Sequence, residues 1–200
     1  MNAEPTVFIV DDDPAVLRSL TVLVKVLFPN VEAFTSAAEF LASYDRSRSG
    51  CLVLDVAMPG MSGLELHRKL TEEKAELPVV FITGHGNVQM AVGAMQSGAV
   101  NFLEKPFREQ DLWDSIRRAI DLDSQIRRRK MRRAGLEDRL SKLTAGERDV
   151  LDLILGGKYN KEIAASLSLS VRTVEDRRAR IMKKMDAKSV AELVQLATAH

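Results

Sequence analysis

The stretch CLVLDVAMPGMSG, from Cys51 to Gly63, places an aspartate directly after a run of apolar, strand-forming residues. The run Cys51–Leu54 predicts a short buried β-strand that ends at Asp55. Pro59 and Gly60 follow, and this pair marks a turn. The pattern indicates that a rigid strand presents the Asp55 carboxylate at its end and that the chain then turns away, which leaves the carboxylate accessible.

Four similar runs elsewhere in the first half of the chain also predict strands: Thr6–Val10, Val31–Phe34, Val79–Thr83 and Asn101–Glu104. Segments with helical spacing lie between them, marked by Val16, Leu17, Leu20, Leu23, Val24 and Leu27, by Leu64, Leu66 and Leu70, and by Met90, Ala91, Ala94 and Met95. Pro14 suits the first turn of the first helix. Alternating strands and helices predict an α/β fold, in which a parallel sheet is covered by helices on both faces.

Polar residues follow four of the predicted strands, and the carboxyl ends of parallel strands share one edge where ligands collect. These residues are Asp11, Asp12 and Asp13 after the first strand, Asp55 after the third, Thr83 and Gly84 after the fourth, and Lys105 after the fifth. Polar residues also simply begin loops, but clustered carboxylates repel one another without a counter-charge. We therefore expect a bound cation at this edge.

Mg²⁺ is the expected cation, with Mn²⁺ as an alternative ion, because it prefers oxygen ligands. Asp55, Asp12 and the carbonyl of Ala57 are the candidate ligands, with Asp11 acting through water. Beside the ion, Asp55 is a candidate nucleophile that carries an aspartyl phosphate. Lys105 and Thr83 are candidates to bind the added phosphate oxygens, and Gly84 keeps the facing loop open.

Charge is distributed unevenly along the chain. Residues 1–122 hold 11 Lys and Arg against 17 Asp and Glu, a net charge of −6, whereas residues 123–200 hold 18 against 11, a net charge of +7. This asymmetry predicts two domains with different partners, and the basic half is the candidate for nucleic acid. The sequence shows neither a membrane-spanning run nor an export signal, and its single cysteine, Cys51, fits a reducing cytoplasmic setting.

The stretch Glu109–Lys142 predicts a helix that joins the halves. Its basic part, Arg127–Leu140, is more typical of a solvated helix face than of a DNA-binding arm.

From Leu143 onward the pattern is helical. Thr144 and Glu147 have capping-box spacing, and Gly156 with Gly157 ends the helix that they begin. Asn160 is the expected cap of a helix ending at Leu167, and a short turn leads to a second helix over Val171–Met185. A last helix is expected over Ser189–Ala199.

The helix Val171–Met185 has a buried and an exposed face by spacing. Val174, Ile181 and Met185 form the inward stripe, while the other face carries Arg172, Glu175, Asp176, Ala179, Arg180 and Lys183. An ordinary amphipathic helix would also show a charged face. Six basic residues on one helix after a tight turn in a net-basic half favour DNA binding.

The first half resembles the receiver domain of two-component response regulators, through FIVDDD, VLDVAMPGMSG, VFITGHG and FLEKPF. The resemblance implies a flavodoxin-like (CheY-like) five-stranded sheet in the order 2-1-3-4-5. It implies Asp55 as phosphoacceptor from a sensor histidine kinase, and a metal site of Asp11, Asp12 and the Ala57 carbonyl. It also implies a cis Lys105-Pro106 bond, and it makes Thr83 and Phe102 the pair that rearranges on phosphorylation.

The second half resembles the LuxR-type helix-turn-helix of FixJ/NarL regulators, with FixJ the nearest pattern, through LTAGERDVL, NKEIA and TVE. Arg177 and Arg180 replace a histidine and an asparagine common in the family, and Glu175 and Asp176 lie where such proteins often reach base edges. Carboxylates accept from a cytosine amino group but repel phosphate. Lys161, Thr173, Arg178 and Arg180 are the expected phosphate contacts.

These observations predict a receiver domain over 1–122, a helical linker over 123–140 and an all-α LuxR-type domain over 141–200. The predicted function is phosphorylation-controlled transcription regulation, with promoter DNA, a cognate kinase and a phosphorylation-dependent homodimer as partners, and RNA polymerase if the protein activates. One rival is a magnesium-dependent phosphohydrolase, but Ala57 occupies the position of its usual second acid. Another rival is a phosphate-independent DNA-binding protein with a vestigial receiver, which the set Asp12, Asp55, Thr83 and Lys105 disfavours.

Overall fold

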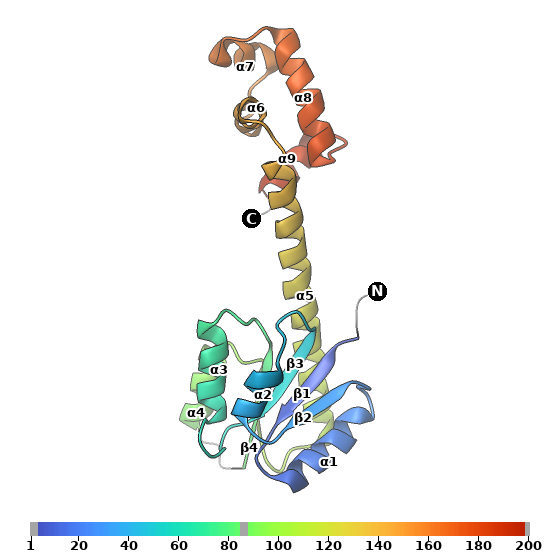
Figure 1. Cartoon of the computed structure of the whole chain (residues 1–200), viewed down its shortest axis with the longest axis vertical. Helices are drawn as coiled ribbons and strands as arrows, with labels where there is room; N and C mark the ends of the chain where they lie inside the picture. Colours follow the sequence, from blue (N-terminus) through green and yellow to red (C-terminus); the bar gives the residue numbers. More distant parts are fainter. Residues whose placement is uncertain (1–3, 85–87, 199–200) are drawn as a thin grey trace. The chain divides into compact units, whose positions relative to one another are not determined.

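The computed structural model describes residues 4–84 and 88–198, and the chain divides into two compact units, Met1–Arg127 and Arg128–His200. Figure 1 shows a sheet with its helices in the first unit and only helices in the second.

The first unit is built on a five-stranded sheet in the order β2-β1-β3-β4-β5, with every pair parallel. The strands are β1 (Thr6–Val10), β2 (Val31–Phe34), β3 (Gly50–Asp55), β4 (Val79–Thr83) and β5 (Asn101–Glu104). The predicted fold class and strand order are therefore confirmed. The central strands β1, β3 and β4 are buried at every position, as expected for parallel strands with both faces covered.

Alternate residues of each strand feed two separate cores. Phe8 of β1 and Leu52 of β3 pack with helices α2 (Ala37–Ser43), α3 (Gly63–Glu72) and α4 (Val88–Gln96). Val7 and Cys51 point to the other face and pack with α1 (Pro14–Lys25) and α5 (Glu109–Ser141). Because strand side chains alternate between the two faces, apolar side chains pack against helices on both faces of the sheet. Polar groups can therefore gather at the carboxyl edge.

Helix α2 was not predicted from the sequence. It has seven residues, and the Ser36 hydroxyl caps it by accepting a hydrogen bond from the Glu39 amide at 3.2 Å. Two turns provide too few positions to show a periodic apolar pattern.

Helix α5 runs without interruption from Glu109 to Ser141, close to the predicted Glu109–Lys142. Asp123 and Arg127, which the predicted division assigns to the linker, bind the loop before β3. The Asp123 carboxylate accepts from the Ser49 hydroxyl at 2.7 Å and the Gly50 amide at 3.1 Å. Arg127 donates to the Ser47 carbonyl at 2.8 Å and to the Arg48 carbonyl. Both residues therefore belong to the first compact unit.

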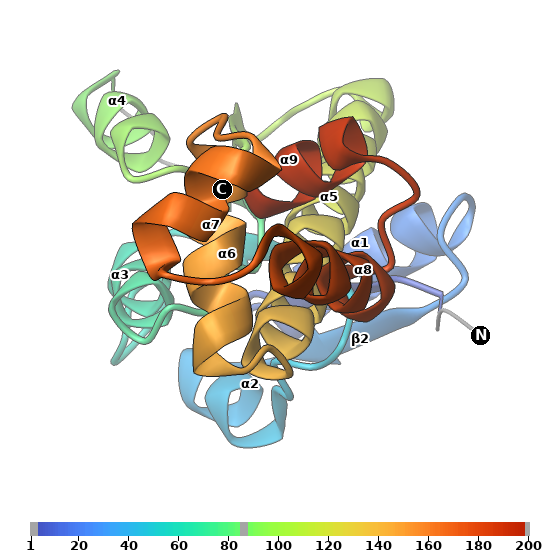
Figure 2. The same ribbon diagram turned by 90° about the horizontal axis from the view of Figure 1, so that it is seen from above.

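The second unit contains the end of α5 and helices α6 (Ala145–Leu155), α7 (Asn160–Leu167), α8 (Val171–Met185) and α9 (Val190–Thr198). Figure 2 shows α6, α7 and α8 grouped together. Their shared core includes Leu136, Val150, Ile163 and Val174. In the expected helix-turn-helix pair, α8 has the predicted limits and α7 ends at the predicted Leu167.

Side-chain hydrogen bonds cap the first turns of α6 and α7. The predicted capping box of α6 is present, with Thr144 and Glu147 bonded reciprocally at 2.8 and 3.3 Å. The prediction that Asn160 caps α7 is wrong, because Asn160 is already helical and the Glu162 carboxylate accepts from the Tyr159 amide at 2.8 Å. The Asn160 side chain bonds to α8 instead.

Among the described residues, no helix is both long and apolar enough to cross a bilayer.

Candidate functional site

Three charged residues from three strand ends meet at the carboxyl edge of the sheet. The Lys105 ammonium lies 2.7 Å from Asp11 Oδ2 and 2.8 Å from Asp55 Oδ1. Asp11 follows β1, Asp55 ends β3, and Lys105 follows β5. Only 2% of Asp11 and 5% of Asp55 is exposed, so the ammonium neutralises two carboxylates that are largely withdrawn from water.

Backbone groups fix the orientation of these side chains. The Ala57 amide donates to Asp55 Oδ2 at 2.7 Å, and the Asp13 amide donates to Asp11 Oδ1 at 3.0 Å. The Lys105 amide donates to the Thr83 carbonyl at 2.7 Å, and the Lys105-Pro106 bond is cis, as the resemblance implied. The loop after β5 is thereby joined to the end of β4, which directs Lys105 towards the two carboxylates.

The pKa of Asp55 stands above its ordinary value because burial penalises the charged carboxylate, and the hydrogen bond and ion pair with Lys105 offset this only in part. Burial also opposes the charged form of Lys105, but its hydrogen bonds to Asp11 and Asp55 outweigh burial and raise the pKa of Lys105. The contact between them therefore favours the charged forms of both the Asp55 carboxylate and the Lys105 ammonium.

The other predicted residues of this edge differ in their exposure. Asp12 is exposed, and Thr83 is fully buried at the end of β4. A Cβ placed on Gly84 would meet nothing within 4 Å, so the facing loop leaves open space there. Phe102 of β5 packs on the core below, 6.2 Å from Phe81 between ring centroids. Asp13 lies outside the cluster, since its carboxylate accepts from the Ala15 amide at 2.7 Å and caps α1.

The donor set at this edge fits a hard divalent cation, because the carboxylates of Asp11 and Asp55 face one point and Asp12 lies beside them. Within residues 4–84 and 88–198, however, no three acidic, histidine or cysteine side chains already converge in a metal-binding arrangement. The Lys105 ammonium faces the same two carboxylates. An incoming cation would therefore have to share these carboxylates with the ammonium.

Gly63 is a residue of this site to which the sequence analysis gave no role. A Cβ built on Gly63 would lie 2.1 Å from the carbonyl oxygen of Asp55, and the Gly63 amide donates to the Val56 carbonyl at 3.0 Å. Only glycine allows α3 to begin this close to the end of β3. The signal was its position at the end of the Cys51–Gly63 stretch, but close approach between backbones cannot be read from spacing.

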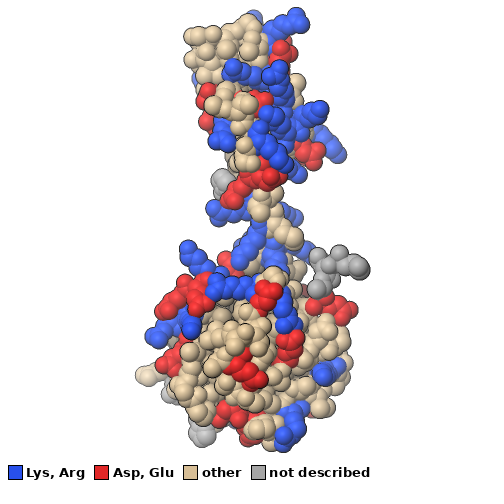
Figure 3. Space-filling view, in the orientation of Figure 1, with Lys and Arg blue, Asp and Glu red and all other residues tan. Residues whose placement is uncertain are grey.

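In the second unit, the charged face of α8 is open to solvent. Arg172, Glu175, Asp176, Arg180 and Lys183 are exposed, whereas the predicted inward stripe is buried. Figure 3 shows Lys and Arg side chains gathered over one face of this unit. The exposed face of α8 thus carries three basic side chains and two carboxylates.

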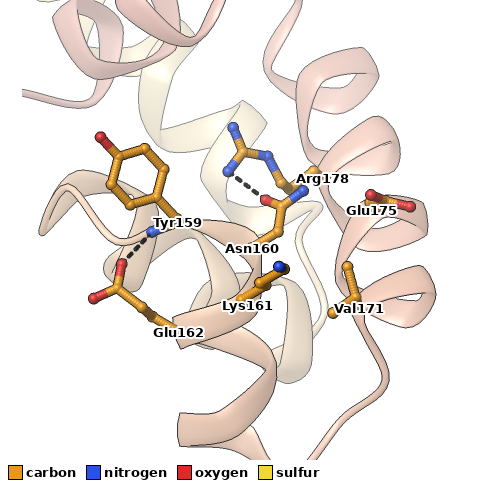
Figure 4. Close-up of a pocket in the computed structure, with 7 residues that line it drawn as sticks. All are labelled: Tyr159, Asn160, Lys161, Glu162, Val171, Glu175 and Arg178. Carbon is orange, nitrogen blue, oxygen red and sulfur yellow. Dashed lines mark hydrogen bonds between the residues drawn. The ribbon is translucent and has the colours of Figure 1, made fainter.

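A groove lies between the start of α7 and the first half of α8, lined by Tyr159, Asn160, Lys161, Glu162, Val171, Glu175 and Arg178 (Figure 4). Arg178 does not point freely to solvent, because its guanidinium donates to Asn160 Oδ1 at 2.9 Å. Arg177 likewise donates to the Gly146 carbonyl of α6 at 3.1 Å. Thr173 is tied to the Ser170 cap through its amide at 3.1 Å.

The first unit has an acidic site with a lysine at the edge of its sheet, and the second unit has a helix-turn-helix whose second helix exposes basic side chains. This combination is typical of a DNA-binding protein controlled through its sheet-edge site. The comparisons with known proteins agree. The family described as "Response regulator receiver domain" matches residues 7–117, and "Bacterial regulatory proteins, luxR family" matches residues 141–197.

Relatives of similar length carry both parts. The chain is 44% identical to "Response regulator protein TodT" of Pseudomonas putida, over 95% of this chain and 84% of the relative. It is 43% identical to "Transcriptional regulatory protein FixJ" of Rhizobium meliloti, over 97% of this chain and 95% of the relative. The solved structure of response regulator StyR has 43% identity and a TM-score of 0.91, covering 99% of this chain and 100% of that one. The chain therefore belongs to the two-component response regulators that join a receiver to a LuxR-type DNA-binding domain, and its function is transcription regulation.

Proposed function

We propose that Asp55 is the phosphoacceptor and that its phosphorylation switches the DNA-binding activity of the chain. The observation that carries this proposal is the contact of Lys105 with both Asp11 and Asp55. The Lys105 ammonium lies 2.8 Å from Asp55 Oδ1, where it could hold the oxygens of a phosphoryl group added to Asp55, and this supports the proposal. The proposed division of the chain is receiver 1–122, linker 123–140 and DNA-binding domain 141–200, with Asp123 and Arg127 of the linker bound to the first compact unit.

In the proposed reaction, an Asp55 carboxylate oxygen attacks the phosphorus of a kinase phosphohistidine. The new O–P bond forms as the N–P bond breaks, and the histidine keeps the electron pair of that bond. The Ala57 amide holds the other oxygen of Asp55 in place. Lys105 exchanges its contact with Asp55 for one with the added phosphate oxygens.

When bound, Mg²⁺ or Mn²⁺ supplies neutralisation of the phosphoryl charge, and Asp11, Asp12, Asp55 and the Ala57 carbonyl would hold it. The chain's own residues provide the remaining positioning. Gly84 leaves room for the donor, and Thr83 lies at the strand end next to β3.

The added phosphoryl group carries about −1.5 to −2 charges. The side chains of Lys105 and Thr83 move to bind its oxygens. Phe102 then repacks, and the surface of α4 and β5 favours a receiver homodimer. Two helix-turn-helix units could meet two half-sites about one helical turn apart on promoter DNA. The proposed contacts to the duplex are made by Lys161, Arg172, Thr173, Arg180 and Lys183, and the proposed contacts to base edges by Glu175 and Asp176. Arg178, which is bonded to Asn160, contributes to DNA binding through that residue.

The proposed cellular setting is the cytoplasm, with a cognate sensor histidine kinase as donor and RNA polymerase as partner if the output is activation. We propose that the chain accepts phosphate and slowly loses it, and is no dedicated enzyme. The residue two positions after Asp55 is Ala57, which cannot serve as the second acid of a phosphohydrolase.

The test compares sedimentation and duplex binding of the wild type, Asp55→Asn and Asp121→Asn, each with and without acetyl phosphate and Mg²⁺. Asp121 is exposed and provides a matched control. We expect the donor to raise the sedimentation coefficient and the DNA affinity of the wild type and the control but not of Asp55→Asn. Indistinguishable behaviour of all three proteins would contradict the switch.

A further inference from the structure

Helix α5 contains a basic segment, Arg128–Arg133, that lies between two anchored points. Before it, Arg127 binds the carbonyls of the loop that precedes β3. After it, Leu136 is buried in the core of the second unit. All residues from Arg128 to Gly135 are exposed to solvent.

The expectation of a solvated face, made for the longer stretch Arg127–Leu140, is revised here for the basic segment, because its charge pattern is unusual for a helix that is merely solvated. Five of its six residues are Arg or Lys, and no Asp or Glu occurs between Asp123 and Glu137. Arg128 with Arg132 and Arg129 with Arg133 are like charges four residues apart, and such pairs destabilise a helix. Glu137 pairs with Arg133 at 2.9 Å, but Arg128, Arg129 and Arg132 have no Asp or Glu three or four residues away on the helix. Solvated helices generally intersperse acidic residues, so an external anion is the natural source of compensation for these three arginines.

The segment is poorly suited to a partner helix. Met131 is its one large apolar residue, so it has no repeating apolar stripe with which to form a coiled coil. A polyanion is the partner that its composition fits.

Within the second unit, the end of α5 is fastened to the C-terminal end of the recognition helix. Arg139 donates to the Met185 carbonyl at 2.9 Å, and Lys184 of α8 donates to the Lys142 carbonyl at 3.0 Å. From Leu136 back to Arg128, a helix rises about 12 Å. Duplex DNA carries one charge per about 1.7 Å of its axis, so this length corresponds to several phosphates beyond those at α8.

We propose that the basic segment is a second DNA-contact surface, which binds backbone phosphates that flank the base pairs met by α8. This inference rests on the proposed duplex binding by α8. The segment would add affinity and salt dependence but little sequence preference, because phosphate contacts position a protein without reading bases.

The test measures the affinity of the full-length chain for a mixed-sequence duplex, by fluorescence anisotropy over a range of KCl concentrations. The variant Arg128→Gln/Arg129→Gln/Arg132→Gln removes three charges, and glutamine keeps the helix propensity close to that of arginine. The control Arg18→Gln/Arg68→Gln/Arg117→Gln removes three exposed charges from the first unit. The variant Arg180→Gln/Lys183→Gln probes α8 itself, and circular dichroism verifies that each protein keeps its helices.

We expect the basic-segment variant to lower the slope of log K against log[KCl] by about 0.9 per lost contact, up to about 2.7 in total. The first-unit control keeps the wild-type slope, and lysine at the same three segment positions restores it. A wild-type slope for the basic-segment variant, with a reduced slope for the α8 variant, would overturn this inference and leave the proposed function standing. Wild-type slopes for both would remove the proposed DNA interface as well.

Two other outcomes also count against the inference. If lysine fails to restore the slope, the arginines act through their shape rather than their charge. If the basic-segment variant loses binding only to vesicles containing phosphatidylserine, the partner is a membrane surface and not DNA.

Discussion

Lys105 is the residue on which two buried carboxylates depend for neutralisation. Replacing it by methionine leaves Asp11 and Asp55 facing each other without a cation, and removing one partner of a buried pair is strongly destabilising. Because a quarter of the Lys105 side chain is exposed, we expect Lys105→Met to lower the free energy of unfolding of the first unit by about 3 kcal/mol, the low end of the usual range. Urea denaturation measures this change.

The exposed Lys69→Met serves as the matched control and should change stability by less than about 0.5 kcal/mol. In the double variant Asp55→Asn/Lys105→Met, part of the lost stability should return, because only one buried carboxylate remains. Strictly additive effects of the two substitutions would contradict the electrostatic coupling.

Gly63 provides a second prediction at the same scale. Gly63→Ala forces a methyl group to within 2.1 Å of the Asp55 carbonyl oxygen, so β3 and α3 must separate. We expect a loss of more than about 2 kcal/mol in unfolding free energy. Gly93→Ala, whose added Cβ meets nothing within 4 Å, should instead be neutral or stabilising in the same urea titration. Equal effects at the two glycines would refute the close approach.

The polar residues of the sheet edge could be predicted from the sequence because strand ends are visible as the ends of apolar runs. The ion pairs of Lys105 and the close approach at Gly63 could not be predicted in the same way. Lys105 and Asp11 are 94 residues apart along the chain, and only the fold brings an ammonium between two carboxylates. Sequence reasoning placed Lys105 at this edge as a phosphate ligand, but it did not predict the direct contacts of Lys105 with Asp11 and Asp55.

Among the helices, α6 shows how one cap can link local structure to packing. Glu147 accepts from the Thr144 amide at 2.8 Å and from the Lys184 ammonium of α8 at 2.7 Å. The hydrogen bond with Lys184, followed by the backbone bond at Thr144, lowers the pKa of Glu147 below its ordinary 4.5. The stabilisation is therefore complete above pH 4.5 and is lost as the pH falls through the lowered pKa.

Glu147→Gln keeps a side-chain acceptor for the cap but removes the charge. We expect the second unit to lose about 1 kcal/mol at neutral pH and to lose less stability than the wild type on acidification below pH 4.5. Helical circular dichroism during urea unfolding at both pH values measures this, with the exposed Glu137→Gln as control. An unchanged acid dependence in Glu147→Gln would show that this carboxylate does not couple α6 to α8.

Helices with a clear apolar pattern were predicted, whereas α2 and the cap of α7 were not. The limits of α8 and the end of α7 follow from apolar spacing and the turn between them. Helix α2 is too short for such a signal. Asn160 was predicted as a cap because asparagine is favoured at helix N-caps. Its carboxamide accepts from Arg178, 18 residues further along, and tertiary contact overrides the local preference.

For the molecule as a whole, each unit has a core of its own, which predicts two unfolding transitions. Phe8 and Leu52 belong to the cores of the first unit, and Val150 and Ile163 to the core of the second. We expect Lys105→Met to shift only the first unit's transition and Glu147→Gln only the second's, in calorimetry of the full chain. A single transition that both substitutions shift equally would contradict this division.

The two-part organisation could be predicted from the change of net charge along the sequence, but the end of the first unit could not. Asp123 and Arg127 belong to that unit through contacts with Ser49 and Ser47, which lie more than 70 residues earlier. No composition boundary marks such a contact.

The central claim is that Asp55 receives the phosphoryl group. Peptide mass spectrometry after incubation of the full chain with acetyl phosphate and Mg²⁺ tests it most directly. We predict one added phosphoryl group, on the peptide that contains Asp55, and none on the same peptide from Asp55→Asn. An unmodified Asp55, or a phosphoryl group that forms equally well in Asp55→Asn, would contradict the account.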